Sequence, residues 1–312
     1  MHDLILHHYP MSPFAEKVRL MLGLKGLAWH SVHIPAVMPK PDVIALTGGY
    51  RKTPILQIGA DIYCDTALIA DVLEHRVAEP PLFPAHARGL SRALAQWADT
   101  PLFWASMAYT LSPKGAAAMF ANRPPGEGQA FAADRAAMRT NMTLLRPADG
   151  TSAYRSYLRR LANMLDDQPY LLGEVPCIAD LAAYHPLWFT RTLNPVLADI
   201  FDATPDVLEW MDRIAAIGHG RPQRLSSTEA VGIAHAATPE PIRPDEVFQD
   251  DHGIPLGSRV SVAAEAFGTE ATEGTLVGAT RTRYTLERHD ERAGSVHVHF
   301  PRVGYVLKEI KA

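Results

Sequence analysis

The sequence predicts three parts in chain order: an α/β domain, an all-helical domain and a small antiparallel β-domain. Short apolar runs alternate with helical patterns over residues 1–79. Residues 87–225 are rich in Ala, Leu, Arg and Met at helical spacing, whereas apolar residues after position 240 alternate with polar or small ones, as in strands. A chain of 312 residues is long enough for two compact domains and a smaller third. We therefore place the domains at 1–79, 87–225 and 240–312.

The pattern of the first part predicts the element order β-α-β-α-β-β-α. Apolar side chains recur at helical spacing over residues 13–25, so one face of this helix is expected to pack on a sheet. Ser12 and Pro13 mark the helix start, because a serine hydroxyl can accept a free N–H and proline needs no donor there. The other expected elements are strands at 3–9, 29–33, 55–58 and 61–64 and helices at 42–46 and 66–75.

Proline-rich stretches separate the three parts. Pro80, Pro81 and Pro84 end the first pattern, and residues 239–244 form a second such linker. About five strands punctuated by glycines then predict a small curved antiparallel sheet or an SH3-like barrel. The alternating pairs are Val260 and Val262, Tyr284 and Leu286, Val296 and Val298, and Tyr305 and Leu307.

Composition favours a small-molecule partner over nucleic acid or a membrane. The formal net charge is -4 with both signs interspersed, which gives no broad positive field for nucleic acid or anionic lipid. The first apolar run is interrupted at His7, so neither a signal peptide nor a membrane span is expected there. Cys64 and Cys177 lie far apart and form no CxxC pair, as is usual in a reducing compartment. We expect a cytoplasmic protein.

Ser12 lies at a predicted strand-to-helix corner. Its hydroxyl would sit beside the positive end of a helix and its free N–H groups, a place that favours an anion. A free thiol has a pKa near 8.5, and such an environment lowers it, so that thiolate becomes abundant at neutral pH. Helix capping alone is the alternative role for this serine.

Two further motifs place polar residues at the predicted start of a strand and of a helix. Thr53 and Pro54 precede a strand, where a cis peptide would expose the Thr53 backbone to an extended peptide ligand; an ordinary trans proline at a strand start is the alternative. Asp65 and Thr66 open a helix and would receive an amino acid that carries both ammonium and carboxylate. Capping alone also explains this pair. Cys64 beside it is expected to be a small buried strand residue.

Together the three motifs resemble the glutathione-transferase family. Residues 12–19, SPFAEKVR, are similar to the segment with the catalytic serine of theta- and zeta-like classes, or the cysteine of omega-like and β-etherase-like relatives. Residues 52–54, KTP, resemble the family's cis-proline element, and residues 65–66, DT, its acidic-Ser/Thr pair. The resemblance covers roughly residues 1–220 and implies a thioredoxin-like N-terminal fold.

The resemblance also implies roles for individual residues. Ser12 would hydrogen-bond the thiolate of glutathione, which serves as co-substrate, and Asp65 with Thr66 would hold its γ-glutamyl end. Thr53, presented by Pro54, would pair with the cysteinyl backbone. Lys40 and Lys52 would reach the glycyl carboxylate.

The expected acceptor pocket lies between the two domains. Residues 97–103, WADTPLF, resemble the family's helix along the pocket, and the candidate wall residues are Met11, Phe103, Trp104 and Met107. Core packing is the alternative for the last three. Asp180, in a motif where Cys177 replaces the usual hydroxyl residue, is expected to be structural rather than catalytic.

No metal site is expected. His7 and His8 have no partner at metal spacing. His297 and His299 would share one strand face, with His289 near by a hairpin, but the sequence places no acidic or cysteine ligand beside them. Tyr9 is the alternative hydrogen-bond donor to the thiol, but the position of the Ser-Pro-Phe motif at residues 12–14 favours Ser12.

These observations predict a dimeric cytosolic enzyme that detoxifies a hydrophobic electrophile by joining it to glutathione, or that cleaves an ether or thioether with it. Two alternatives stay open: a glutathione-dependent isomerase, and a non-enzymatic binding module acting through residues 240–312. The role of that β-domain is unknown. As a separate accessory domain it would be removable near Pro239 without loss of glutathione binding.

Overall fold

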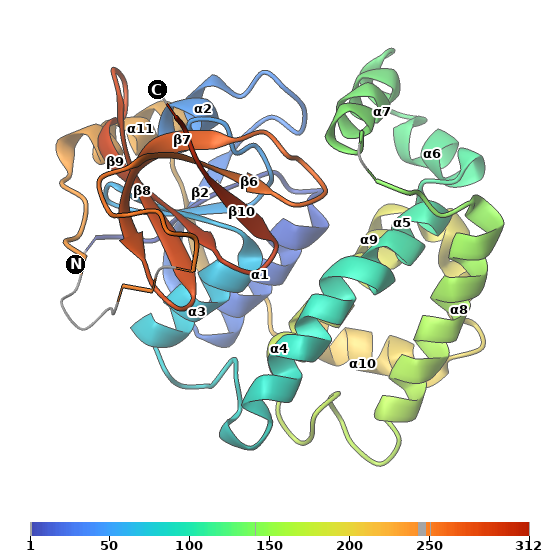
Figure 1. Ribbon diagram of the computed structural model, residues 1–312. Helices are drawn as coiled ribbons and strands as arrows, with labels where there is room; N and C mark the ends of the chain where they lie inside the picture. The colour runs from blue at the N-terminus through green and yellow to red at the C-terminus, as the bar shows by residue number, and fades with distance from the viewer. Residues whose placement is uncertain (1, 141, 243–247, 250, 312) are drawn as a thin grey trace.

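The computed structural model describes residues 2–140, 142–242, 248–249 and 251–311, and Figure 1 shows a strand-rich part beside a helical part. The N-terminal elements have the predicted order and form the expected thioredoxin-like domain. They are β1 (Ile5–His8), α1 (Pro13–Leu24), β2 (Ala28–His33), α2 (Pro41–Thr47), β3 (Ile55–Ile58), β4 (Asp61–Cys64) and α3 (Thr66–Arg76). Strand β1 pairs in parallel with β2 and antiparallel with β3, and β3 pairs antiparallel with β4.

The second part is helical, as predicted. Its elements are η1 (Ala85–Ala87), α4 (Arg88–Trp97), the π-helical turn η2 (Ala98–Leu102), α5 (Phe103–Thr110), α6 (Pro113–Phe120), α7 (Glu127–Met138), α8 (Pro147–Met164), α9 (Ile178–Leu193), η3 (Pro195–Phe201) and α10 (Pro205–Ala215). Helix α9 is buried on nearly all sides, as its strongly apolar sequence requires. No helix in the described part of the chain has the length and apolar character needed to cross a membrane.

Asp180 holds the start of α9. Its carboxylate accepts the backbone N–H of Cys177 at 3.0 Å, the backbone N–H of Leu171 at 2.8 Å and the indole N–H of Trp210 at 3.0 Å. These bonds satisfy donors that would otherwise be buried without a partner. The carboxylate therefore has a structural role.

The C-terminal part, residues 240–312, contains the five expected strands. Two elements that the sequence did not predict precede it: β5 (Arg221–Arg224), which lies within the range expected to be all-helical and pairs instead with β2, and α11 (Ser227–Ala236). The five strands are β6 (Arg259–Ala264), β7 (Thr272–Ala279), β8 (Arg283–Asp290), β9 (Gly294–Pro301) and β10 (Tyr305–Glu309). They are antiparallel to one another. An SH3-like barrel is not confirmed, because β9 pairs in parallel with β4 and the described strands form one sheet in the order β10-β6-β7-β8-β9-β4-β3-β1-β2-β5.

The two faces of the N-terminal strands belong to different hydrophobic cores. Successive side chains of a strand point to opposite faces. Leu6 and Leu56 face a core shared with α1, α3 and the helical domain, whereas Ile5 and Ile55 face one shared with α2, α11 and strands β6–β10. Figure 1 shows this division, with β6–β10 on one side of the molecule and α4–α10 on the other. The C-terminal strands therefore share a core with the first domain.

Candidate functional site

The three sequence motifs meet at one edge of the sheet. In the register, His7 lies opposite Ile55, and Ile55 lies opposite Cys64. Because β1 and β4 both end at this edge and β3 begins there, the segments next to these strand ends are neighbours. The motifs at residues 12–19, 52–54 and 65–66 all adjoin these ends, so their meeting point is the candidate site.

Ser12 is the N-cap of α1. Its Oγ accepts the backbone N–H of Ala15 at 3.2 Å, and the residue is only 2% exposed. Capping uses a lone pair of the hydroxyl oxygen and leaves the hydroxyl hydrogen free to donate elsewhere. In the described part of the chain no side-chain or backbone oxygen takes this hydrogen. A cap and a donor to an anion are therefore compatible roles for Ser12.

The Thr53–Pro54 peptide bond is cis, which decides between the two conformations that the sequence left open. The ammonium of Lys40 donates to the backbone oxygen of Arg51 at 3.2 Å and to Oγ1 of Thr53 at 3.4 Å. Burial, together with the charge of Arg135, lowers the pKa of Lys40 to about 8. An arriving carboxylate would favour the charged form of this lysine.

Asp65 and Thr66 begin α3 in an unusual backbone conformation. Asp65 has φ 79°, which non-glycine residues seldom adopt and which is concentrated at functional sites. Its Oδ1 accepts the backbone N–H of Ala67 at 2.9 Å. Oγ1 of Thr66 accepts from the ammonium of Lys17 at 3.2 Å, and this ammonium also lies 2.6 Å from a carboxylate oxygen of Asp99.

A tyrosine from the C-terminal strands contacts this pair. The hydroxyl of Tyr305, on β10, donates to Oδ2 of Asp65 at 3.0 Å. The ammonium of Lys52 lies over the rings of Tyr305 and Tyr50, at 4.7 and 5.5 Å from their centroids. Burial raises the pKa of the Tyr305 hydroxyl well above its usual value and lowers the pKa of Lys52. The hydroxyl is therefore a donor to Asp65 at all ordinary pH values.

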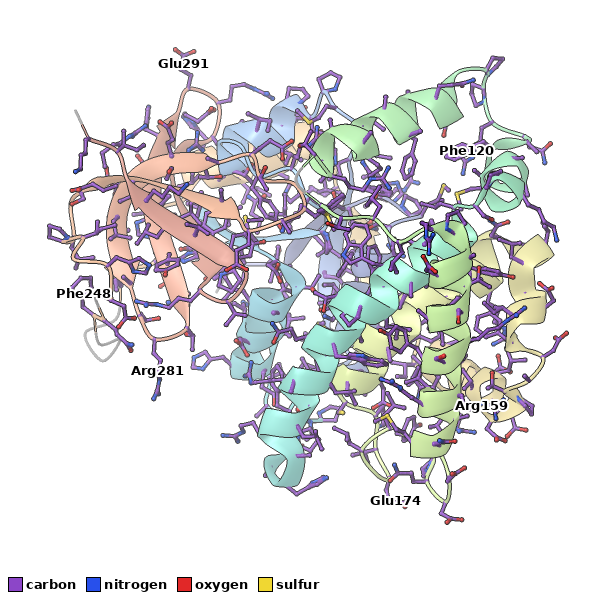
Figure 2. All side chains as sticks on the ribbon, turned by 45° about the vertical axis from the view of Figure 1, so that its right-hand side comes forward. Phe120, Arg159, Glu174, Phe248, Arg281 and Glu291 are labelled. Atoms are coloured by element: carbon purple, nitrogen blue, oxygen red, sulfur yellow. The ribbon has the colours of Figure 1, made fainter. Side chains whose placement is uncertain are left out.

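The loop between β6 and β7 covers the same region. The N–H of Gly268 donates to the backbone oxygen of Met138 on α7 at 3.0 Å, and the ring of Phe267 lies edge-on to Trp104 at 5.2 Å. A Cβ at Gly268 would come within 2.8 Å of Met138 and 3.0 Å of Lys52, and its φ of +65° also favours glycine. Side chains fill the region between the C-terminal strands and the helical domain in Figure 2.

The predicted acceptor-pocket residues on α5 lie together and are packed. Phe103 and Met107 are each 8% exposed and share a small apolar cluster, and the rings of Phe103 and Trp104 are 5.0 Å apart. Met11 lies apart from this cluster, where its sulfur accepts a guanidinium N–H of Arg123 at 2.8 Å. For Phe103, Trp104 and Met107 the geometry fits core packing, the alternative that the sequence left open.

The predicted site residues differ in exposure. Ser12, Lys40 and Thr66 are between 2% and 4% exposed, whereas Lys52, Thr53 and Asp65 are partly exposed. Two cavities of about 300 and 310 Å³ do not include these residues: one lies beside Arg288 and Glu273, and the other beside Arg19 and Trp188. A ligand could therefore reach Thr53 and Asp65 from solvent, whereas the buried Ser12 would need its neighbours to move aside.

Three residues at the candidate site were not identified from the sequence: Lys17, Gly268 and Tyr305. Lys17 is in the N-terminal motif, but nothing in its charge predicts that it is 1% exposed. Tyr305 lies 240 positions from Asp65 along the chain. Its strand alternation predicts that one face is buried, but no local pattern names the partner.

Comparisons with known proteins agree with the fold. Residues 6–81 match the family described as Glutathione S-transferase, N-terminal domain, and residues 130–213 match Glutathione S-transferase, C-terminal domain. A solved GST-like protein from Pseudomonas syringae is 42% identical, with a TM-score of 0.83, over 99% of this chain and 100% of that chain.

More distant relatives match a smaller share of the chain. A solved glutathione S-transferase from Rhodospirillum rubrum F11 is 20% identical, with a TM-score of 0.51, over 68% of this chain and 88% of that one. FtsZ-localized protein A of Caulobacter vibrioides is 26% identical over 57% of this chain and 73% of its own length. The match to the Pseudomonas protein thus extends over the C-terminal strands, whereas these two matches cover less of the chain.

Proposed function

This chain belongs to the glutathione S-transferase family, and we propose that it is a glutathione-dependent transferase of the serine type. The observation that carries the proposal is the meeting of Ser12, Thr53 and Asp65 at adjoining strand ends. A hydroxyl donor, the backbone of Thr53 before a cis-proline and a carboxylate at one place suit the three parts of a γ-glutamyl tripeptide thiol.

The proposed binding mode assigns one group to each part of glutathione. Asp65 accepts the α-ammonium, because each of its carboxylate oxygens has a lone pair left after the bonds from Ala67 and Tyr305. The hydroxyl of Thr66, which accepts from Lys17, keeps a hydrogen to donate to the α-carboxylate. The Thr53 backbone pairs with the cysteinyl residue. Lys40 and Lys52 provide positive charge for the glycyl carboxylate.

Ser12 then acts on the thiol. Its free hydroxyl hydrogen donates to the thiolate, and the N-terminus of the 12-residue helix α1 favours the negative charge. A hydrogen bond to a charged group contributes about 1.5–3 kcal/mol. The protein thus supplies thiolate and proximity, and no covalent enzyme intermediate is needed.

The proposed acceptor is a small hydrophobic electrophile, or an ether or thioether that the thiolate cleaves. It would lie against Met11 and the cluster of Phe103, Trp104 and Met107. A glutathione-dependent isomerase would use the same thiolate and release glutathione unchanged. Product analysis by mass spectrometry distinguishes the two, because only transfer leaves a glutathione adduct.

Titration calorimetry of glutathione into the full-length chain tests the proposal. We expect one glutathione per chain, and Asp65→Ala should weaken binding about tenfold to a hundredfold, as the loss of a bond to a charged group of about 1.5–3 kcal/mol implies. Asp71→Ala is the matched control, since Asp71 lies on the same helix and pairs with Arg92 at 2.6 Å. Equal affinities of wild type and Asp65→Ala would contradict the proposed binding mode.

The second candidate is a binding module without catalysis. It is favoured by Tyr305, whose hydroxyl already occupies one oxygen of Asp65, and by the low exposure of Ser12. The similarity to FtsZ-localized protein A is compatible with such a role. Failure of the full-length chain to take up glutathione at all would support this candidate over the transferase.

A further inference from the structure

A buried cluster of one carboxylate and two imidazoles lies where the C-terminal strands join the N-terminal ones. In the parallel pair of β4 and β9, Asp61 lies opposite His297, and Tyr63 lies opposite His299. These four side chains share one face because their positions alternate by two. Asp61, His297 and His299 are 2%, 7% and 2% exposed, and one potential ligand atom from each lies within 4.8 Å of the others.

Two members of the cluster are held in place by hydrogen bonds. Nε2 of His299 lies 2.8 Å from Oδ1 of Asp61, and its Nδ1 lies 3.0 Å from Oγ1 of Thr285. The ring of His299 also stacks on Tyr63 at 4.4 Å. The second carboxylate oxygen of Asp61 accepts the backbone N–H of Glu240 at 2.8 Å. Both residues are therefore fixed in orientation before any ligand arrives.

The third member has an unused nitrogen. Nδ1 of His297 has no hydrogen-bond partner among the described residues, although the atom is buried and the residue is only 7% exposed. It lies 3.8 Å from Oδ1 of Asp61, which is too far for a hydrogen bond. Such a buried, unpaired polar atom is costly and calls for an explanation.

We propose that Asp61, His297 and His299 bind a divalent transition-metal ion of the zinc type. With ligand bonds of about 2.0–2.2 Å, two ligands of a tetrahedral ion are about 3.4 Å apart, close to the spacing in the cluster. The ion would bind Oδ1 of Asp61, Nδ1 of His297 and Nε2 of His299. Two imidazoles and one carboxylate suit Zn²⁺ or Co²⁺, whereas Ca²⁺ and Mg²⁺ require more oxygen ligands.

Neighbouring groups complete the arrangement. Metal binding would replace the hydrogen bond between Nε2 of His299 and Asp61: with the proton of His299 on Nδ1 instead, that atom donates to Thr285, and Nε2 has a lone pair for the ion. Nε2 of His297 points toward Glu287, whose carboxylate lies 3.9 Å away. A water molecule would take the fourth position of the tetrahedron. The ion would thus be a structural link between β4 of the first domain and β9 of the C-terminal part.

The topology explains why the sequence alone gave no such site. His297 and His299 are visible as an alternating pair, but their acidic partner is 236 and 238 positions away, in strand β4. Only the parallel pairing of β4 with β9 brings Asp61 to them. Metal binding at this place would stabilise the assembled fold, and it does not depend on glutathione binding.

Cobalt titration of the tag-free full-length chain, after treatment with a chelator, tests the site. We expect one Co²⁺ per chain with the visible absorption of a tetrahedral ion, displacement by Zn²⁺, and a higher unfolding temperature with metal bound. Thr285→Val should weaken binding by roughly 10–100-fold, because it removes the hydroxyl that orients the ring of His299, and His297→Ala should weaken it more. His289→Ala is the matched control, since His289 is an exposed histidine on the same hairpin, and it should bind like wild type.

The wild-type titration decides the matter even where a variant does not fold. No uptake of cobalt by the folded wild-type chain would overturn the proposal. Uptake that His289→Ala weakens as much as His297→Ala would also overturn it, because the metal would then be on surface histidines.

Discussion

Two stretches of the same sheet, β1–β4 and β6–β10, differ in how far their sequence determines their place. For β1–β4 the strands, the intervening helices and their order were all predicted. For β6–β10 the strands were predicted but not their neighbour: β9 joins β4. Alternating side chains mark a strand, whereas the choice of a partner far along the chain depends on which apolar faces are buried together. Local patterns therefore define elements, and tertiary burial defines their assembly.

The same difference appears at the candidate site. The N-terminal stretch supplies Ser12, Thr53 and Asp65, which local motifs identify. The C-terminal stretch supplies Tyr305 and Gly268, which cover them. The C-terminal strands thus belong to both the core and the site. We expect changes in them to lower the stability of the fold strongly and the glutathione affinity more weakly.

Removal of the C-terminal strands has the largest expected effect. Ile5, Ile55 and Ile62 face the core that these strands complete, and exposing each costs about 1.5–3 kcal/mol. Their sum is comparable with the whole stability of a domain, about 5–15 kcal/mol. Residues 1–238 alone should therefore aggregate or lack a cooperative unfolding transition in circular dichroism. A monodisperse, glutathione-binding fragment would instead support a removable accessory domain.

Ser12→Ala comes next. Turnover at neutral pH should fall by one to two orders of magnitude, as expected for a lost hydrogen bond of about 1.5–3 kcal/mol to the thiolate, while glutathione affinity changes little. The matched control is Ser226→Ala, because Ser226 caps α11 with the same 3.2 Å bond to a backbone N–H. Both variants should lose about 1 kcal/mol of stability, and only Ser12→Ala should lose activity. Unchanged turnover would move the role of thiol donor to Tyr9.

Tyr305→Phe has the smallest expected effect. It tests most directly whether the C-terminal strands contribute to the glutathione site. The ring over Lys52 stays, and only the bond from the hydroxyl to Asp65 is lost. The bond orients Asp65 with and without ligand, so only part of its roughly 1.5–3 kcal/mol would be lost from binding; a loss of about 1 kcal/mol lowers glutathione affinity in calorimetry about fivefold. Tighter binding in the variant would show instead that Tyr305 competes with the ligand, as the binding-module candidate requires.

The site residues that the sequence identified are those whose role depends on their neighbours in the chain. Ser12 and Asp65 were identified because helix starts carry local signals, and Thr66 followed from the same motif. The cis Thr53–Pro54 bond was left open because both isomers fit the same residues. Tyr305 and the pairing of Asp61 with His299 were missed, since residues more than 200 positions apart are joined only by the completed sheet.

The most direct test of the central claim is the pKa of the glutathione thiol when bound to the full-length chain. Ultraviolet absorbance of the thiolate, followed against pH, gives this value. We predict a midpoint at least one unit below the free value of about 8.5 in wild type and a return toward it in Ser12→Ala. A bound thiol that titrates as it does in free solution in both proteins would contradict the account.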